Sequence, residues 1–198
     1  MDGARLITLG GKTPLIHPTA FIAPGAILIG DVEIGPEASI WYNCVLRGDV
    51  NKIRVGARSN IQDGSVIHVD SPRPGHEGGQ PTIIGEDVLI GHMAMVHGCV
   101  LHDRAFVGLG SIVMDGCEIE SGAMLAAGAL LTPGRKIPSR QLWAGRPAKP
   151  VRELSDEDLA GQQAGVAHYV ELAKLHAAAL REPRAGSEGP GAARPGNR

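Results

Sequence analysis

The chain has 198 residues and a formal net charge of −2, enough for one domain with a sizeable core and an appended element. The small net charge excludes a broad basic surface, so neither nucleic acid nor anionic membrane lipid is expected as a partner. Glycine is abundant, with 28 residues, and aromatic residues make up only 3% of the chain. This composition disfavours a helical bundle and suits a tightly turned, repetitive β structure.

The first residues, MDGARLITLGGK, lack the apolar core of a secretory signal. No uninterrupted apolar run approaches the roughly 18 residues that a membrane helix needs. The three cysteines are an odd number in a chain without an export signal, which favours a reducing compartment over disulfide formation. We therefore expect a cytoplasmic protein without a membrane segment.

Aliphatic residues recur every six positions from Ile16 to Leu46 and, after the short insertion Asn51-Lys52, from Val55 to Ile67. After a Gly/Pro-rich interruption the series runs from Ile84 to Val96, and after a slip of one residue it continues from Leu101 to Ile137. A small residue stands two places before most of them. A step of six is neither the helical period nor simple strand alternation, and it indicates one short strand and one turn per repeat, with three repeats to a coil. The sequence predicts an all-β fold over residues 1–150, a parallel β-helix with aliphatic and small residues facing its axis.

Two further expectations follow from this pattern. Cys44, Cys99 and Cys117 all occupy the inward small-residue position, so they should be buried core side chains. The pattern stops after Ile137, and residues 143–148 form a turn-rich exit from the coil.

The rest of the chain is predicted to be a helix and a tail. Ser155 is a helix N-cap with Asp158 three residues on, so residues 151–182 should form a C-terminal α-helix packed along the coil. Residues 183–198 are poor in apolar side chains and are predicted to be a disordered tail. The aliphatic residues available for packing the helix on the coil are Leu159, Val166, Val170, Leu172 and Leu175.

Three histidines stand at informative places in the repeat. His68 and His97 directly follow Ile67 and Val96, which lie three repeats apart. They should therefore stack on adjacent coils, with their backbones about 4.8 Å apart, close enough for both imidazoles to reach one cation. His92 lies two places after Ile90, one face away, where it is better placed to reach a neighbouring subunit.

Three neutral imidazoles with an open fourth position are the ligand set of a catalytic zinc. Because one of the three faces away, the geometry predicts a site completed across a subunit interface, and hence a homotrimer. Further polar residues should converge on the same corner of the coil: Arg47, Asp49, Asn60, Gln62 and Asp63.

Several segments together resemble the gamma-class carbonic anhydrase family and its short-loop subgroup. They are Arg47-Gly48-Asp49, Asn60-Ile61-Gln62-Asp63, His68, Gly91-His92 and His97-Gly98-Cys99, and the similarity extends over residues 12–150. The resemblance implies a left-handed β-helix and a homotrimer in which His68 and His97 come from one subunit and His92 from the next. It implies Zn²⁺, or Fe²⁺ in some members. The implied reaction is the reversible hydration of CO₂ to bicarbonate by a metal-bound hydroxide at the trimer interface.

The resemblance also assigns roles to the remaining candidates. Gln62 would orient the bound hydroxide, and Arg47 would lie near the bicarbonate. Asn60 and Tyr169 would border the pocket. Interface ion pairs would involve Arg47, Asp49 and Asp63, for which trimer pairing is as good an interpretation as a direct catalytic role. Tyr169 is equally well read as a residue that packs the helix.

The chain departs from the family pattern in two places. Val50 stands where the family carries an acidic residue directly after the Arg-Gly-Asp unit, and the loop that bears a proton-shuttling glutamate in the family here reads SPRPGHEGGQP. His76 and Glu77 are the candidates to replace the shuttle, and their alternative is to be solvated loop residues. These departures bear on the rate of turnover rather than on the metal site.

Two other functions are compatible with the same fold. The first is a hexapeptide acyltransferase or a CoA-thioester hydrolase, which would use an interface histidine as a base. The second is a catalytically silent subunit of a trimeric assembly that keeps the metal for stability. Metal content and CO₂ hydration separate all three.

Overall fold

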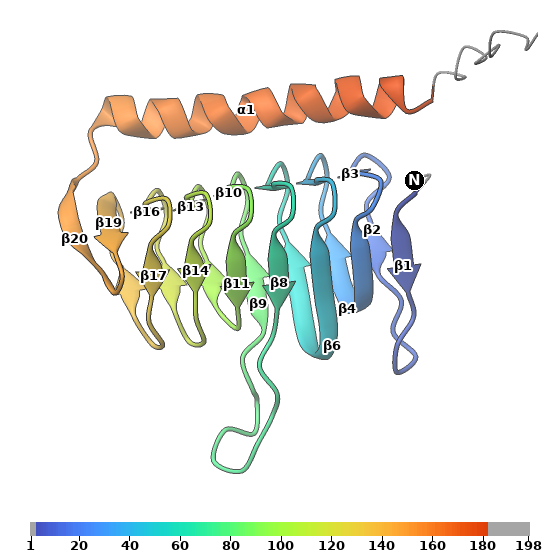
Figure 1. Ribbon diagram of the computed structural model, residues 1–198, viewed down its shortest axis with the longest axis horizontal. Coiled ribbons are helices and arrows are strands. Elements are labelled where there is room, and N and C mark those ends of the chain that lie inside the picture. The colour runs from blue at the N-terminus through green and yellow to red at the C-terminus, as the bar shows by residue number, and fades with distance from the viewer. Residues whose placement is uncertain (1–2, 182–198) are drawn as a thin grey trace, which may run out of the picture.

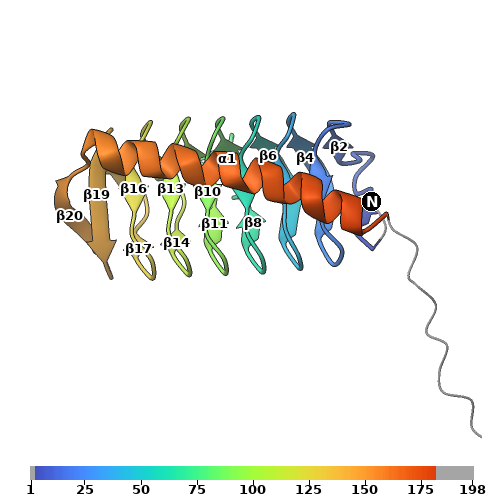
Figure 2. The same cartoon turned by 90° about the horizontal axis from the view of Figure 1, so that it is seen from above.

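The computed structural model describes residues 3–181, which form a parallel β-helix and one long helix that lies along it (Figures 1 and 2). The helix, α1 (Asp156–Ala179), runs over the row of turns on one side of the coil. The predicted parallel β-helix with a C-terminal helix is confirmed. The predicted tail, 183–198, lies outside the described residues.

The strands form three faces around the axis. The first, here called the histidine face, contains β1 (Arg5–Ile7), the beginnings of β4 (Ile27–Ile34) and β6 (Val45–Val55), β8 (Val66–His68), β11 (Met95–His97), β14 (Ile112–Val113) and β17 (Leu130–Leu131). The second contains β2 (Leu15–Ile16), the ends of β4 and β6, β9 (Thr82–Ile84), β12 (Val100–Leu101), β15 (Glu118–Ile119) and β18 (Lys136–Ile137).

The third face, here called the helix face, contacts α1. It contains β3 (Phe21–Ile22), β5 (Ser39–Ile40), β7 (Asn60–Ile61), β10 (Leu89–Ile90), β13 (Phe106–Val107), β16 (Met124–Leu125), β19 (Gln141–Gly145) and β20 (Ala148–Glu153). All neighbouring strands on it are parallel except β19 and β20, which pair antiparallel.

The six-residue period places equivalent aliphatic residues directly above one another. On the histidine face Leu46 pairs with Ile67, Ile67 with Val96, and Val96 with Val113. All four are fully buried. Full burial of one such side chain stabilises the fold by about 1.5–3 kcal/mol, so the axial column is a main source of stability. The insertion Asn51-Lys52 is accommodated inside β6, which runs without a break from the histidine face onto the second face.

The exit from the coil differs from the expected turn. Trp143 pairs with Leu125 in the parallel register, so β19 adds one more strand to the helix face. The indole is buried at the end of the core. The chain then reverses in β20 and reaches α1, so a hairpin rather than an irregular turn closes this end.

Helix α1 has the predicted N-cap, because Ser155 forms a capping box with Asp158. The predicted start of the helical segment at residue 151 is wrong, because residues 151–153 belong to β20. Near the other end of α1 Tyr169 and His176 pack edge-on against Trp41 of the helix face, with ring centroids 5.3 and 5.0 Å apart. Tyr42 Oη lies 2.8 Å from Nδ1 of His176. These aromatic contacts fix the helix over the coil.

One expectation about this helix is wrong. Leu175 is 65% exposed, whereas Val166 and Ala173 are buried against the coil. Leu175 lies two residues beyond Ala173, which places it on the opposite side of the helix. Within residues 3–181, no helix has both the length and the apolar character needed to cross a membrane.

The buried cysteines make a testable prediction. Cys44, Cys99 and Cys117 are free thiols in the core, as expected from their positions in the repeat. Burial raises the pKa of all three and brings that of Cys44 to about 12. At pH 8 the thiolate fraction of Cys44 is then about one in ten thousand. We expect Ellman's reagent to leave the native protein unmodified at pH 8 and to titrate three thiols in guanidinium chloride. Rapid modification of the native protein would contradict the placement of these residues.

Candidate functional site

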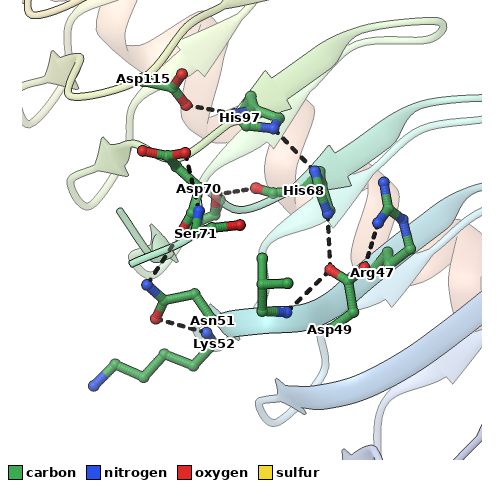
Figure 3. Close-up of polar contacts among 11 residues, drawn as sticks. Arg47, Asp49, Asn51, Lys52, His68, Asp70, Ser71, His97 and Asp115 are labelled. Atoms are coloured by element: carbon green, nitrogen blue, oxygen red, sulfur yellow. Dashed lines mark hydrogen bonds and ion pairs between the residues drawn. The ribbon is translucent and has the colours of Figure 1, made fainter. Parts of the chain in front are cut away.

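His68 and His97 lie side by side on the histidine face (Figure 3). Both end short strands, and the parallel register pairs them directly because Ile67 pairs with Val96. Nδ1 of His68 lies 2.9 Å from Nε2 of His97. The predicted stacking of these two residues on adjacent coils is therefore what the structure shows.

Each of the two imidazoles also contacts a carboxylate with its other nitrogen. Nε2 of His68 lies 2.9 Å from Oδ1 of Asp49, and Nδ1 of His97 contacts Oδ1 of Asp115. An ionised carboxylate only accepts hydrogen bonds, so these outer nitrogens carry the ring protons. In neutral rings, the two inner nitrogens then face each other with their lone pairs. Such an arrangement is stable only with a proton or a cation between them.

Asp49 is held in its ionised form. Burial by itself would raise the pKa of Asp49, but the hydrogen bonds from His68 and Arg47 outweigh burial and keep the pKa below its ordinary value. Arg47 also forms an ion pair with Asp49. Arg47, Asp49 and His68 thus form one connected chain, in which the carboxylate fixes the tautomer of His68.

The residues present fit a divalent metal ion. Tetrahedral zinc with Zn–N bonds of 2.0–2.1 Å separates two ligand nitrogens by roughly 3.3 Å, close to the spacing of the inner nitrogens. Metal-bound histidines characteristically donate their other N–H to a carboxylate, which is the arrangement that Asp49 and Asp115 provide. His68 and His97 can therefore hold one ion between them.

His92 belongs to a separate group. Its strand neighbour Ile90 pairs with Ile61, so His92 and Asp63 occupy equivalent places on adjacent coils, as the repeat predicts. Nδ1 of His92 lies 2.8 Å from Oδ2 of Asp63, which leaves Nε2 free to accept or bind. Tyr169 Oη lies 3.5 Å from that Nε2. Both the His92 and the Asp63 side chains are 41% exposed.

Asn60 and Gln62 lie beneath this second group. Both side chains are buried, and Nε2 of Gln62 donates to Oδ1 of Asn60 at 3.1 Å. The amide nitrogen of Asn60 is buried and has no hydrogen-bond partner within the described residues. Buried donors are rarely left unpaired, so this amide is a strained part of the site region.

The loop with the two shuttle candidates projects from the coil between β8 and β9 (Figure 1). Asn51 fixes its base, because its side-chain amide donates to the carbonyl oxygens of Asp70 and Gly78. His76 Nε2 lies 4.0 Å from the Asp70 carboxylate, and Glu77 accepts a hydrogen bond from the Gly75 amide. Both side chains turn back onto the loop itself. Their role as proton shuttle remains a prediction.

The expectation that the polar residues converge on one corner is therefore wrong for a single chain. Arg47 and Asp49 lie with the His68 and His97 pair, whereas Asn60, Gln62, Asp63 and Tyr169 lie with His92. In the described part of the chain, no three histidine, cysteine or acidic side chains converge on a common point. The cause is the angle between coil faces, which separates His92 from the other two.

Sequence analysis missed Asp115. This residue lies two places after Val113, which pairs with Val96, so it occupies the coil next to His97. The six-residue repeat places Asp115 on the coil after His97, so its position could have been found from the sequence. Asp49 lies in β6, on the coil before His68, and Asp115 follows β14, on the coil after His97, so an acidic residue stands on either side of the histidine pair.

Comparison with known proteins supports these observations. A family model described as bacterial transferase hexapeptide (six repeats) matches residues 13–48. The chain is 45% identical to gamma carbonic anhydrase 2, mitochondrial, of Arabidopsis thaliana over 87% of its own length and 62% of the relative's. It is 44% identical to a carbonic anhydrase of Geobacillus kaustophilus over 85% of its own length and 88% of that protein.

A solved structure of a hexapeptide transferase family protein from Anaplasma phagocytophilum has the same fold. It is 47% identical, with a TM-score of 0.81, and the match covers 88% of this chain and 98% of that one. The chain belongs to the gamma-class carbonic anhydrase family of hexapeptide-repeat proteins. It spans less than two thirds of the length of the Arabidopsis relatives.

The carboxylate at His97 makes a second prediction. Replacing Asp115 with alanine frees the His97 ring to rotate and to change tautomer, so we expect the affinity for Zn²⁺ to fall by about 10- to 100-fold. Competition with a chromophoric chelator measures this. The matched control is Asp103→Ala, which removes a carboxylate that accepts a hydrogen bond from the Glu86 amide and contacts no histidine. Equal zinc affinities in the two variants would show that Asp115 does not orient a ligand.

Proposed function

We propose that this protein catalyses the reversible hydration of CO₂ to bicarbonate, as a zinc-dependent enzyme whose site is shared between two protomers of a homotrimer. The observation that supports this best is the facing pair of ring nitrogens on His68 and His97, 2.9 Å apart, with each ring oriented by its own carboxylate. The family relationship supports the reaction, since the relatives named above include carbonic anhydrases.

His68 and His97 supply two ligands and His92 of a neighbouring protomer supplies the third. The exposure of His92 and its separation from the other two histidines in one chain support this division. Iron could occupy the same ligand set, because imidazole suits both metals. When bound, the divalent ion supplies a Lewis acid that allows a water molecule to lose its proton near neutral pH.

The other polar residues bind and orient the reactants. Arg47 offers a guanidinium beside Asp49 and can hold the bicarbonate anion, because guanidinium and planar oxyanions match in geometry. Gln62 and Asn60 provide a fixed amide pair to orient the attacking oxygen. Tyr169 stabilises the position of His92 from α1 and borders the pocket. Asp49 and Asp63 contact histidines of their own chain and contribute carboxylates at the protomer interface.

The rival functions predict different measurements. An acyltransferase or CoA-thioesterase would act on acyl-CoA without bound metal, with His92 as a base oriented by Asp63. A silent assembly subunit would bind metal and form a trimer but would not hydrate CO₂. Stopped-flow CO₂ hydration by protein of known zinc or anaerobic iron content is the decisive experiment. Acyl-CoA turnover by the metal-free protein, without CO₂ hydration, would overturn the proposal.

Complementation between variants tests the shared site. His92→Ala and His97→Ala should each lose metal and activity as separate preparations, because each breaks every site in its own homotrimer. After unfolding and refolding an equal mixture, about a quarter of the interfaces should combine an intact His68 and His97 pair with an intact His92. Activity and metal content should recover to about that fraction of the wild-type values.

The control for this experiment is a mixture of His97→Ala with His68→Ala. Both substitutions affect the same half of the site, so no interface in the mixed trimers is intact and no recovery is expected. Recovery in both mixtures, or in neither, would contradict the division of ligands between protomers.

A further inference from the structure

A charged column runs along the coil beneath one side of α1. On this side a turn residue with a positive φ recurs from coil to coil, and the amides of Arg58, Asp87, Arg104 and Gly122 each donate to a carbonyl of the preceding coil. The column reads, in order, Glu37, Arg58, Asp87, Arg104, Gly122 and Arg140. Its first three members alternate in sign.

Most charges in this column have a partner. Arg58 bonds to Asp87, with Nε 2.7 Å from Oδ1, and Lys174 of α1 lies 3.9 Å from Glu37. At the other end, Arg140 pairs with Asp156 at 2.7 Å. Arg104 is different. Within residues 3–181 its guanidinium takes part in no ion pair or side-chain hydrogen bond.

Gly122 leaves an opening in the column between two arginines. Because glycine has no side chain, a cavity of about 290 Å³ lies between the coil and α1, with Arg104 and Arg140 on its walls. The remaining wall residues are polar or small, apart from Leu159 on the helix, and include two serines on neighbouring turns. These wall residues are Ser121, Gly122, Ser139, Gln162 and Gln163.

Gln162 of α1 is an independent indication that the cavity receives a ligand. The nitrogen and oxygen of its amide each expose less than 1 Å², and neither has a hydrogen-bond partner in the described part of the chain. A buried amide without hydrogen-bond partners is energetically costly, so such a group is normally paired. Gln162 is one of the residues that line the cavity, and a rotation of its side chain would bring the amide to a molecule bound there.

We propose that this cavity is a binding site for a phosphate-class oxyanion, either inorganic phosphate or the phosphate group of a small monoester. Two guanidinium groups, two hydroxyl groups and one carboxamide supply donors from several directions, which is the donor set that phosphate oxygens accept. The anion lies at Gly122, where the column has no charged side chain between Arg104 and Arg140. Glu120 and Asp156 lie nearby, but their carboxylates are engaged by Lys136 and Arg140.

The site lies within one protomer and is separate from the histidines. It joins α1 to three successive turns, so its occupancy should strengthen the docking of the helix. The proposal does not depend on the reaction proposed above, because none of the lining residues belongs to either histidine group.

Isothermal titration calorimetry with inorganic phosphate, at constant ionic strength set by chloride, tests the site. We expect the full-length protein to bind phosphate in the millimolar range or tighter, with one equivalent per chain, and to unfold at higher temperature when phosphate is present. Arg104→Gln should weaken binding by about tenfold or more, because it removes a charged hydrogen-bond donor. A methyl phosphate titration shows whether a monoester is accepted as well as the free anion.

Three further variants complete the test. Lys174→Gln removes a positive charge from the same side of the column, outside the cavity, and should leave phosphate affinity unchanged. Gln162→Leu keeps the size of the side chain and should weaken phosphate binding while the protein remains folded. His92→Ala should bind phosphate as the wild type does. Absence of binding, equal affinity in Arg104→Gln and wild type, or loss of binding in His92→Ala would overturn the proposal.

Discussion

Register along the coil axis is the constraint on which the rest of this structure depends. Every coil must place one aliphatic side chain per face toward a narrow axis, directly above its predecessor. A shift of one residue would turn buried side chains outward over a whole face, so the register is strongly fixed. Because the core fixes the register, it also fixes the neighbours of every outward-facing residue. The histidine pair and the charged turn column are both consequences of this order.

Stacking places side chains at equivalent positions of adjacent coils next to one another, where like groups repel. Two arrangements in this structure reduce that repulsion. Beneath α1, opposite charges alternate from coil to coil and pair with one another. On the histidine face two imidazoles meet, and carboxylates on the adjacent coils accept hydrogen bonds from their outer N–H groups. The second arrangement leaves two lone pairs facing each other, which disfavours the isolated pair. Because the two facing lone pairs repel each other, a bound cation stabilises this pair of imidazoles strongly.

Much of this could be predicted from the sequence, because a six-residue period maps directly onto coils and faces. Counting residues in the repeat predicts the pairing of His68 with His97, the equivalence of Asp63 and His92, and the buried cysteines. The N-cap sequence predicts the capped helix. Counting fails where position depends on side-chain reach across coils. The repeat gives the coil of Asp115 but not the contact of its side chain with His97, and the cavity at Gly122 also requires the helix that passes over it. The outward position of Leu175 likewise depends on how α1 is rotated, which the aromatic contacts of Trp41 determine.

The two histidine groups are organised independently, which matters for assembly. Asp49 and Asp115 orient His68 and His97, whereas Asp63 orients His92 with its Nε2 free. The tautomer of every candidate ligand is therefore set within its own protomer, before any partner arrives. Joining two such halves requires little reorganisation of the rings, so more of the energy of metal binding remains to stabilise the interface. Under the proposed function, metal binding and subunit association are then coupled, and each strengthens the other by the same factor. The alignment of the coils thus places in one chain the two unlike halves that, under the proposed function, neighbouring chains would bring together.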